Sequence, residues 1–226
     1  MFPPPYDLLP RLCDLPVNPA VVASFHNAAQ ISKTWRETFP EQSLIPGILD
    51  DLVIVTAHLT AESIRTEGAS WSDSIGTGLL VNPLVYQLYE LRVGELRHGS
   101  RGEVLQEVFR IAALLFLRRT KWHAVFVSSL IDSQVVKLKH LLCTTNEYYW
   151  TGFETLKAWI LVMGALYTRS HSAERLWYET EILRELGCME GVGLPDLLAQ
   201  VKGILWFEDL FAEFELTLRK ELRMLS

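Results

Sequence analysis

The sequence predicts an all-α protein, a single compact domain of roughly nine or ten helices packed around one buried central helix. The central helix is expected over Phe153–Tyr167 (FETLKAWILVMGALY), because no charge follows Lys157 until Arg169. A helix that is apolar on nearly every side must be covered on nearly every side. It is also shorter than the roughly 20 apolar residues that cross a bilayer. Nowhere do several apolar–polar alternations lie between turn signals, so no β-sheet is expected.

Prolines separate an extended N-terminal segment from the helical domain. Residues 1–18 are rich in proline, which resists helix formation, so this segment should run extended along the surface. The helical domain is expected to fill residues 19–226. Its first helix is predicted from Asn18 as the N-cap and Pro19 as the first helical residue, and it should run to Thr38.

The remaining helices are predicted from apolar residues at helical spacing. The clearest is Glu103–Arg119, with acids in its first turn and arginines at its end, as the helix dipole favours. The stretch Gly68–Gly78 (GASWSDSIGTG) is predicted to be a loop. The other helices are expected to start at Ile45, at Asn82-Pro83, at Trp122 (to Leu142), after Ser172 (ending just before Gly187) and at Pro195 (to about Trp206). Phe207–Leu225 is expected either to continue this last helix or to form a separate final helix.

Charge and motif content argue against several classes of function. The net charge is −6 without any basic block, so neither a nucleic acid nor a membrane surface is expected as a partner. The three cysteines form no CxxC pair and no two histidines lie four residues apart, so no metal site is expected. The absence of a phosphate-binding loop, a dinucleotide fingerprint or an HExxH motif argues against a cofactor. No signal peptide is recognised, and the protein is expected to be intracellular, either cytoplasmic or nuclear.

Three stretches resemble packing motifs of a known family. They are NPLVYQLYELR with EVLQEVFRIAALLFL, then LKAWILVMGALYTRSHSAERLWYETEILRELG, and finally LPDLLAQVKGILWFED. Over about residues 80–210 they resemble the fungal-specific transcription factor regulatory domain. The positions that match its motifs include Glu107, Arg110, Gly164, Arg175, Trp177 and Tyr178.

The resemblance carries expectations about function. The family's regulators have an N-terminal zinc cluster of six cysteines and a basic linker, and this sequence shows neither. It therefore resembles a free-standing member that does not bind DNA in the family's way. Such free-standing domains resemble cofactor-free cyclases of fungal secondary metabolism that act on polyketides of the phenalenone type. The resemblance thus implies a hydroalkoxylation, in which a phenol oxygen adds to a prenyl alkene and closes a ring.

Ionisable side chains inside apolar helices are the candidate catalytic groups. Adding a phenol oxygen to an alkene needs an acid beside the alkene, and a carboxyl group kept protonated by burial would serve. Asp51 and Asp132 are the candidates for this acid, and Arg110 is the candidate for holding a phenolate or carbonyl oxygen. The alternative is that Arg110 pairs with a carboxylate such as Glu107 or Asp51 and only joins helices.

Aromatic and histidine side chains are the candidates for binding the substrate. A cavity walled by aromatic rings would suit a flat aromatic ligand and would stabilise a passing carbocation through cation–π attraction. The alternative is that the rings belong to a packed core and that the histidines are hydrogen-bonded within it. The candidate substrate-binding residues are His58, Trp122, His123, Tyr149, Trp150 and Trp159.

Two functions therefore compete. The first is a cofactor-independent cyclase whose ligand is a small aromatic polyketide. The second is a non-catalytic regulatory or metabolite-sensing module related to fungal transcription factors. An enclosed aromatic pocket that holds a carboxyl group would favour the cyclase, whereas a solid core with an exposed apolar groove would favour the module. A homodimer formed through an apolar helix face is compatible with either function.

Overall fold

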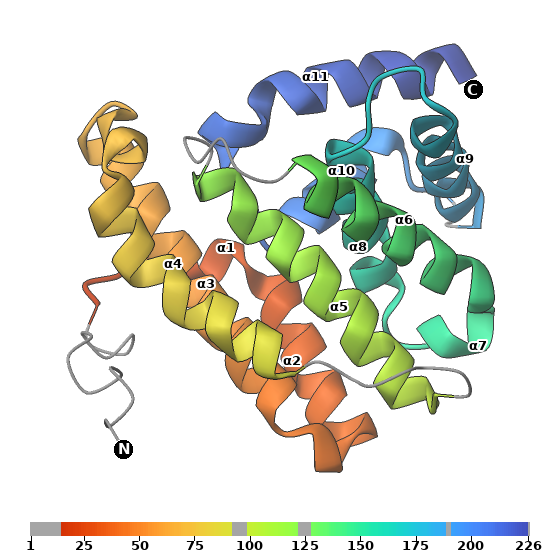
Figure 1. The fold of residues 1–226 in the computed structure, drawn as a ribbon, viewed down its shortest axis with the longest axis horizontal. Helices are drawn as coiled ribbons and strands as arrows, with labels where there is room; N and C mark the ends of the chain where they lie inside the picture. Colours follow the sequence, from red (N-terminus) through yellow and green to blue (C-terminus); the bar gives the residue numbers. More distant parts are fainter. Residues whose placement is uncertain (1–14, 92–98, 122–127, 189–190, 226) are drawn as a thin grey trace.

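The fold is entirely α-helical throughout the part of the chain that the structure describes (Figure 1). The structure is a computed structural model and describes residues 15–91, 99–121, 128–188 and 191–225, with the backbone alone at 74, 121 and 128–132. Eleven α-helices and three short 3₁₀ helices occupy these residues, and none of them forms a strand. The predicted all-α fold class is confirmed.

Short connections join most of the helices. The first half of the fold contains α1 (Pro19–Ser24), α2 (His26–Thr38), η3 (Pro40–Gln42), α3 (Leu44–Arg65), η4 (Ala69–Ser72), α4 (Ser74–Glu90) and α5 (Arg101–Arg118). The second half contains η5 (Arg119–Lys121), α6 (Ser128–Thr144), α7 (Glu147–Trp150), α8 (Glu154–Leu166), α9 (Ala173–Cys188), α10 (Leu194–Lys202) and α11 (Glu208–Leu225).

The helix α8 lies in the centre of the fold, as its apolar sequence predicted. Every side chain from Ala158 to Ala165 is buried. The helix packs against α5, α9 and α10 and also touches α6, and Figure 1 shows it enclosed by these elements. A second buried helix, α5, crosses beside it, with all residues from Glu107 to Leu117 buried. These two helices form the core on which the others pack.

Aromatic rings fill this core by packing on one another. In one cluster Trp35 meets Phe153 edge-on with ring centroids 5.2 Å apart. In another, Phe116 stacks on Phe207 at 4.8 Å. Trp159 lies against the same Phe116 ring and is fully buried. Each ring is thus covered by its neighbours, which gives the core the close packing typical of protein interiors.

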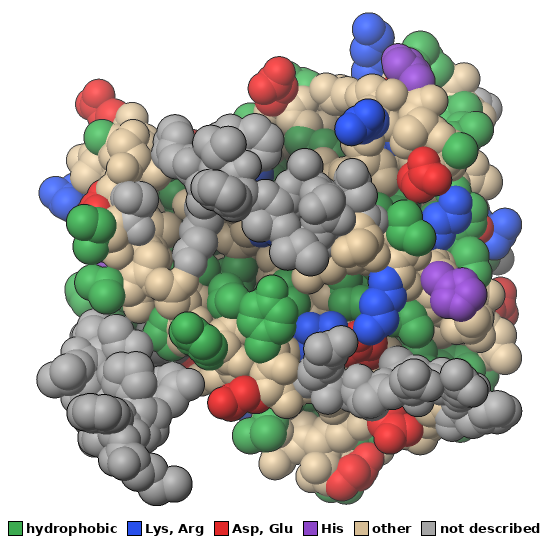
Figure 2. Space-filling model, viewed as in Figure 1, with side chains coloured by type: hydrophobic (Ala, Val, Ile, Leu, Met, Phe, Trp, Pro, Cys, Tyr) green, Lys and Arg blue, Asp and Glu red, His purple; other side chains and the backbone are tan. Residues whose placement is uncertain are grey.

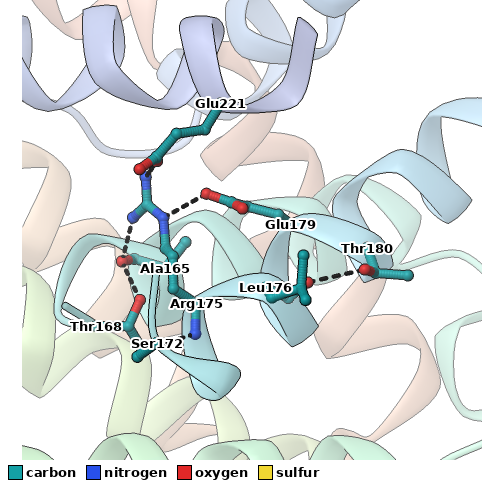
Figure 3. Close-up of polar contacts among 8 residues, drawn as sticks. All are labelled: Ala165, Thr168, Ser172, Arg175, Leu176, Glu179, Thr180 and Glu221. Atoms are coloured by element: carbon teal, nitrogen blue, oxygen red, sulfur yellow. Dashed lines mark hydrogen bonds and ion pairs between the residues drawn. The ribbon is translucent and has the colours of Figure 1, made fainter. Parts of the chain in front are cut away.

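A buried arginine joins three helices in the C-terminal half (Figure 3). Arg175 on α9 donates from Nε to Glu179 at 2.6 Å, from one terminal nitrogen to the carbonyl oxygen of Ala165 at 2.5 Å, and from the other to Glu221 on α11. A buried charge needs such partners because desolvation would otherwise make it very costly. The network therefore fixes α11 against α9 and the end of α8.

The helix predicted from Asn18 to Thr38 is divided in two at Phe25. Asn18 caps α1 as predicted, accepting from the backbone N–H of Ala20 at 2.9 Å. The carbonyl of Gly203 accepts hydrogen bonds from the N–H groups of Asn27 and Ala28 at 3.0 and 3.2 Å. A distant backbone oxygen thus satisfies the donors at the start of α2, which a continuous helix would have bonded internally.

The start of α4 differs from the prediction. The helix begins at Ser74 rather than at Asn82-Pro83, and Pro83 lies inside it. Asp73 caps the helix by accepting from the N–H groups of Ile75 and Gly76 at 3.2 and 2.9 Å. The predicted loop Gly68–Gly78 is accordingly shorter, since most of it is taken up by η4 and the first turn of α4. The Asp73 cap starts the helix early, despite the cost of an internal proline.

The helix α3 has the length and hydropathy of a membrane-crossing helix. It is 22 residues long with a mean hydropathy of 1.5 in its most apolar window, and 56% of that window is buried inside the fold. A buried core helix can meet the same criteria of length and composition.

Candidate functional site

An open groove between the start of α3 and the end of α4 contains one of the predicted acids. Its cavity volume is about 300 Å³. The apolar side chains of its wall are Leu44, Ile48 and Leu91, and its carboxyl groups belong to Asp51 and Glu90. The remaining residues that line it are Ser43, Gly47 and Gln87. We call this cavity the α3–α4 groove.

Two adjacent aspartates on α3 have different surroundings. Asp50 accepts a hydrogen bond from the Ser32 hydroxyl at 2.7 Å and forms an ion pair with Arg36 at 2.5 Å, both on α2. Asp51 lies in the α3–α4 groove and has no hydrogen-bond or ion-pair partner among the described residues. Burial, with the nearby negative charge of Asp50, raises the pKa of the Asp51 carboxyl above its ordinary value. The Asp51 carboxyl therefore keeps its proton to a higher pH than an ordinary aspartate does.

Gln87 lines the same groove and has a side-chain acceptor without a partner. Its side-chain oxygen Oε1 is buried and accepts no hydrogen bond. Six buried side-chain atoms in the described part of the chain lack a partner, and of these Gln87 Oε1 alone belongs to a residue that lines the α3–α4 groove. Gln87 was not predicted from the sequence, because a single glutamine in a helix carries no signal until its neighbours are known.

Arg110 is engaged away from the groove. Its guanidinium donates to both carboxylate oxygens of the buried Glu107, at 2.6 and 2.8 Å, and Lys137 on α6 also reaches Glu107 at 2.6 Å. Burial alone would raise the pKa of Glu107, but the hydrogen bonds from Arg110 and Lys137 hold that pKa below its usual value. The pairing with Glu107 agrees with the alternative interpretation, but Arg110 and Glu107 both lie on α5, and it is Lys137 that links Glu107 to α6.

The predicted aromatic residues do not line the α3–α4 groove. Trp159 is fully buried and its ring nitrogen donates to the Leu205 carbonyl at 3.0 Å. Trp150 is also buried and donates to the Thr145 hydroxyl at 3.0 Å. Tyr149 is half-buried beside it on α7 and packs against the core. No aromatic ring is among the described residues that line the groove, so the predicted aromatic cage around the acid is not found there.

The other predicted residues are dispersed or lie outside the described part. His58, on α3 two turns beyond Asp51, has Nδ1 3.1 Å from the carbonyl oxygen of Pro16. Trp122 and His123 lie outside the described residues, and of Asp132 only the backbone, in α6, is described. The structure therefore brings Asp51 together with Gln87 and Glu90, neither of which was predicted as a site residue. Among the predicted site residues whose side chains are described, only Asp51 lines the groove.

A larger cavity of about 380 Å³ opens between α6, α7, α8 and α9. Its cations are already paired: Lys157 with Glu185, and Arg184 with Glu181 at 2.8 Å. Two exposed free cysteines, Cys143 and Cys188, lie on its wall. No group of three or more metal-ligating side chains that could hold an ion occurs among the described residues. These ion pairs leave neither Lys157 nor Arg184 free to bind an anionic ligand in this cavity.

The outer face of α4 is unusually apolar. Ile75, Leu79, Tyr86 and Tyr89 are at least half exposed, with Ile75 at 76% and Tyr86 at 61%. Figure 2 shows hydrophobic side chains exposed along this helix. The positions repeat at spacings that place them on one stripe of the helix surface, as in helices that pack against another helix. We call these four residues the α4 stripe.

Chemically, the α3–α4 groove combines a proton donor, Asp51, with an apolar wall. Such a site can bind a small neutral molecule and donate a proton to it.

Comparison of the chain with protein-family models, with curated proteins and with solved structures found no match. The resemblance to the fungal regulatory domain therefore stays a prediction.

Proposed function

We propose that the protein is a cofactor-independent cyclase of fungal secondary metabolism, with Asp51 as its general acid and an aromatic polyketide as its substrate. One observation carries the proposal: an unpaired carboxyl group lies in an apolar groove, and burial raises its pKa. General acids are tuned in this way, because the proton must be present near neutral pH and yet be transferable. The resemblance to the fungal regulatory domain supplies the reaction class.

The proposed reaction needs no component beyond the substrate and Asp51. The Asp51 carboxyl gives its proton to one carbon of a prenyl alkene, and the phenol oxygen forms a bond to the neighbouring cationic carbon. The phenol then releases its proton to the Asp51 carboxylate, which restores the acid. One C–H and one C–O bond form, the alkene π bond and one O–H bond break, and the product is an isomer of the substrate.

The test is to incubate the purified protein with a fungal metabolite extract rich in prenylated phenols, without added cofactors, and to follow masses by chromatography and mass spectrometry. We expect a new species of unchanged mass and a rate that falls about 10²- to 10⁴-fold in Asp51→Asn. Asp50→Asn is the matched control, because Asp50 faces α2, and it should keep the activity of any folded protein. Unchanged turnover in Asp51→Asn would remove Asp51 from the role of acid.

A second function has its own support. The core aromatic rings pack on one another, the groove is open, and the α4 stripe exposes an apolar helix face. These features fit a non-catalytic regulatory module that senses a metabolite in the groove and contacts a protein, including a second copy, through the α4 stripe. In the same incubation, such a module would retain an unchanged species in stoichiometric amount. Leu79→Glu would then weaken protein association, measured by light scattering, without affecting the retained species.

A further inference from the structure

Two carboxyl groups and one guanidinium are buried together where α11 meets α9 (Figure 3). The side chains of Arg175, Glu179 and Glu221 are 3%, 6% and 9% exposed. Nε of Arg175 donates to Glu179 at 2.6 Å, and a terminal nitrogen of the same guanidinium donates to Glu221. We call these three residues the α9–α11 cluster. With both carboxyl groups ionised, the single cation would leave one buried negative charge uncompensated, which is costly.

The α9–α11 cluster avoids this charge by keeping one proton. Glu179 and Glu221 hydrogen-bond each other, and a bond between two carboxyl groups requires that one of them is protonated. Burial and the hydrogen bond to Glu221 raise the pKa of Glu179 above its ordinary value. Burial alone would raise the pKa of Glu221 as well, but hydrogen bonds from Glu179 and Arg175 hold that pKa below its ordinary value. The proton therefore belongs to Glu179, while Arg175 neutralises Glu221.

The groups around the cluster do not replace this proton. Ser170, in the connection before α9, donates to Glu221 rather than to Glu179. Charged side chains of α6, α8 and α11 are engaged at other positions: Lys139 lies over the Trp177 ring, Lys157 pairs with Glu185, and Glu215 pairs with Lys202 and Arg219. When Glu179 ionises, the guanidinium beside it is therefore one that already neutralises Glu221.

We propose that Glu179 and Glu221 hold one proton between them, and that losing it as pH rises loosens α11 from α9. Opening would bring Glu179 into water, so the docked helix holds a proton that the opened helix releases. Opening would also expose Leu218 and Leu222, which are buried on the inner face of α11. The cluster would thus couple pH to the exposure of an apolar helix face. The inference is independent of the proposed function, because none of the three residues lines the α3–α4 groove.

The sign of the effect follows from the titration of Glu179. Its folded pKa lies above the ordinary value of 4.5, so its contribution to docking is fully present below 4.5 and is lost as pH rises through the folded pKa. Because one proton is released, the equilibrium constant for opening should rise by up to about tenfold per pH unit in this window. Glu221 contributes in the opposite sense and only below its ordinary value of 4.5.

The test is amide hydrogen exchange of the full chain, followed by mass spectrometry from about pH 5 to about pH 8 and corrected for the intrinsic exchange rate. We expect the amides of α11 to exchange faster than those of the buried helix α5, because α11 opens without the rest of the fold. We also expect the opening constant of α11 to rise with pH. Exchange of α11 and α5 at the same rate, or an opening constant that does not change with pH, would overturn the inference.

Variants assign the pH dependence to the shared proton. Glu179→Gln keeps the shape of a protonated glutamate and can still donate to Glu221, so the rise with pH should disappear. Glu221→Gln should reduce the rise, because Arg175 then neutralises Glu179 alone. Glu213→Gln is the matched control, since it removes one exposed carboxylate from the same helix, and it should keep the rise of the wild type. An unchanged rise in Glu179→Gln or in Glu221→Gln would contradict a proton shared by the two.

Discussion

Arg175 of α9 forms a buried ion pair with Glu221 of α11, 46 residues further along the chain, and also donates to Glu179. The guanidinium is almost fully enclosed, with Phe214 packed at 5.1 Å from its central carbon. Because Glu179 and Glu221 share this cation and also hydrogen-bond each other, the network is a single unit. It couples the C-terminal helix to the core.

Replacing Arg175 with leucine should therefore cost about 3–5 kcal/mol in the free energy of unfolding, because two carboxylates would stay buried without their cation. Arg184→Leu is the control: the Arg184 side chain is 64% exposed in its pair with Glu181, so this pair should contribute less than about 1 kcal/mol. Urea unfolding followed by circular dichroism gives both values. Equal losses in the two variants would show that the network does not hold α11.

The contact between Gly164 on α8 and Tyr178 on α9 should tolerate no methyl group. A Cβ at Gly164 would overlap the Tyr178 ring, whose hydroxyl donates to the Val135 carbonyl at 3.0 Å. We expect Gly164→Ala to destabilise the protein by about 1–3 kcal/mol through overpacking. In contrast, Gly187→Ala meets no atom within 4 Å and should be neutral or stabilising by up to about 1 kcal/mol. Thermal unfolding of both variants tests the pair, and a stable Gly164→Ala protein would contradict the close packing.

The sequence was sufficient to predict those parts of the fold that depend on local signals. The expected central helix Phe153–Tyr167 agrees with α8 to within one residue at each end. Ser172 accepts from the N–H of Arg175 at 3.1 Å and so caps α9 as predicted. A Ser100–Glu103 capping box starts α5 close to the expected residue. Side-chain caps and apolar stripes can be read from neighbouring residues alone, which is why these elements were predictable.

Features that depend on distant residues could not be predicted in this way. The division at Phe25 depends on a carbonyl from Gly203, almost 180 residues away. In the groove, Asp51 could be proposed because an acid in an apolar helix is unusual, whereas Gln87 becomes a candidate only once its oxygen is known to be buried and unpaired. The sequence also does not show which aromatic rings cover one another. Trp150 and Trp159 are buried in the core, and no aromatic ring is among the described residues that line the groove.

The stability of the protein should depend on pH through Asp51 in a defined direction. The folded protein binds the Asp51 proton more tightly than the unfolded chain, whose pKa is near the ordinary value of 3.8. Asp51 therefore costs the folded state stability as pH rises from about 3.8 through the raised pKa. We expect Asp51→Asn to be more stable than the wild type at pH 7, with the difference shrinking below pH 3.8. Urea unfolding at both pH values measures this difference.

Asp50→Asn should behave in the opposite way at pH 7. It removes the partner of Arg36 and Ser32 and offers no relief of a buried charge, so it should destabilise the protein. If Asp51→Asn were less stable than the wild type at pH 7, the carboxylate of Asp51 would have a stabilising partner, and the groove would not hold an acid.

The most direct test of the central claim is the titration of the Asp51 carboxyl carbon by ¹³C NMR in protein labelled at aspartate, with Asp51→Asn assigning the signal. We predict a midpoint clearly above 3.8, because burial and the charge of Asp50 raise the pKa of this carboxyl. A midpoint at or below 3.8 would mean that Asp51 is ionised like an ordinary surface aspartate, and it would contradict its role as the proton donor.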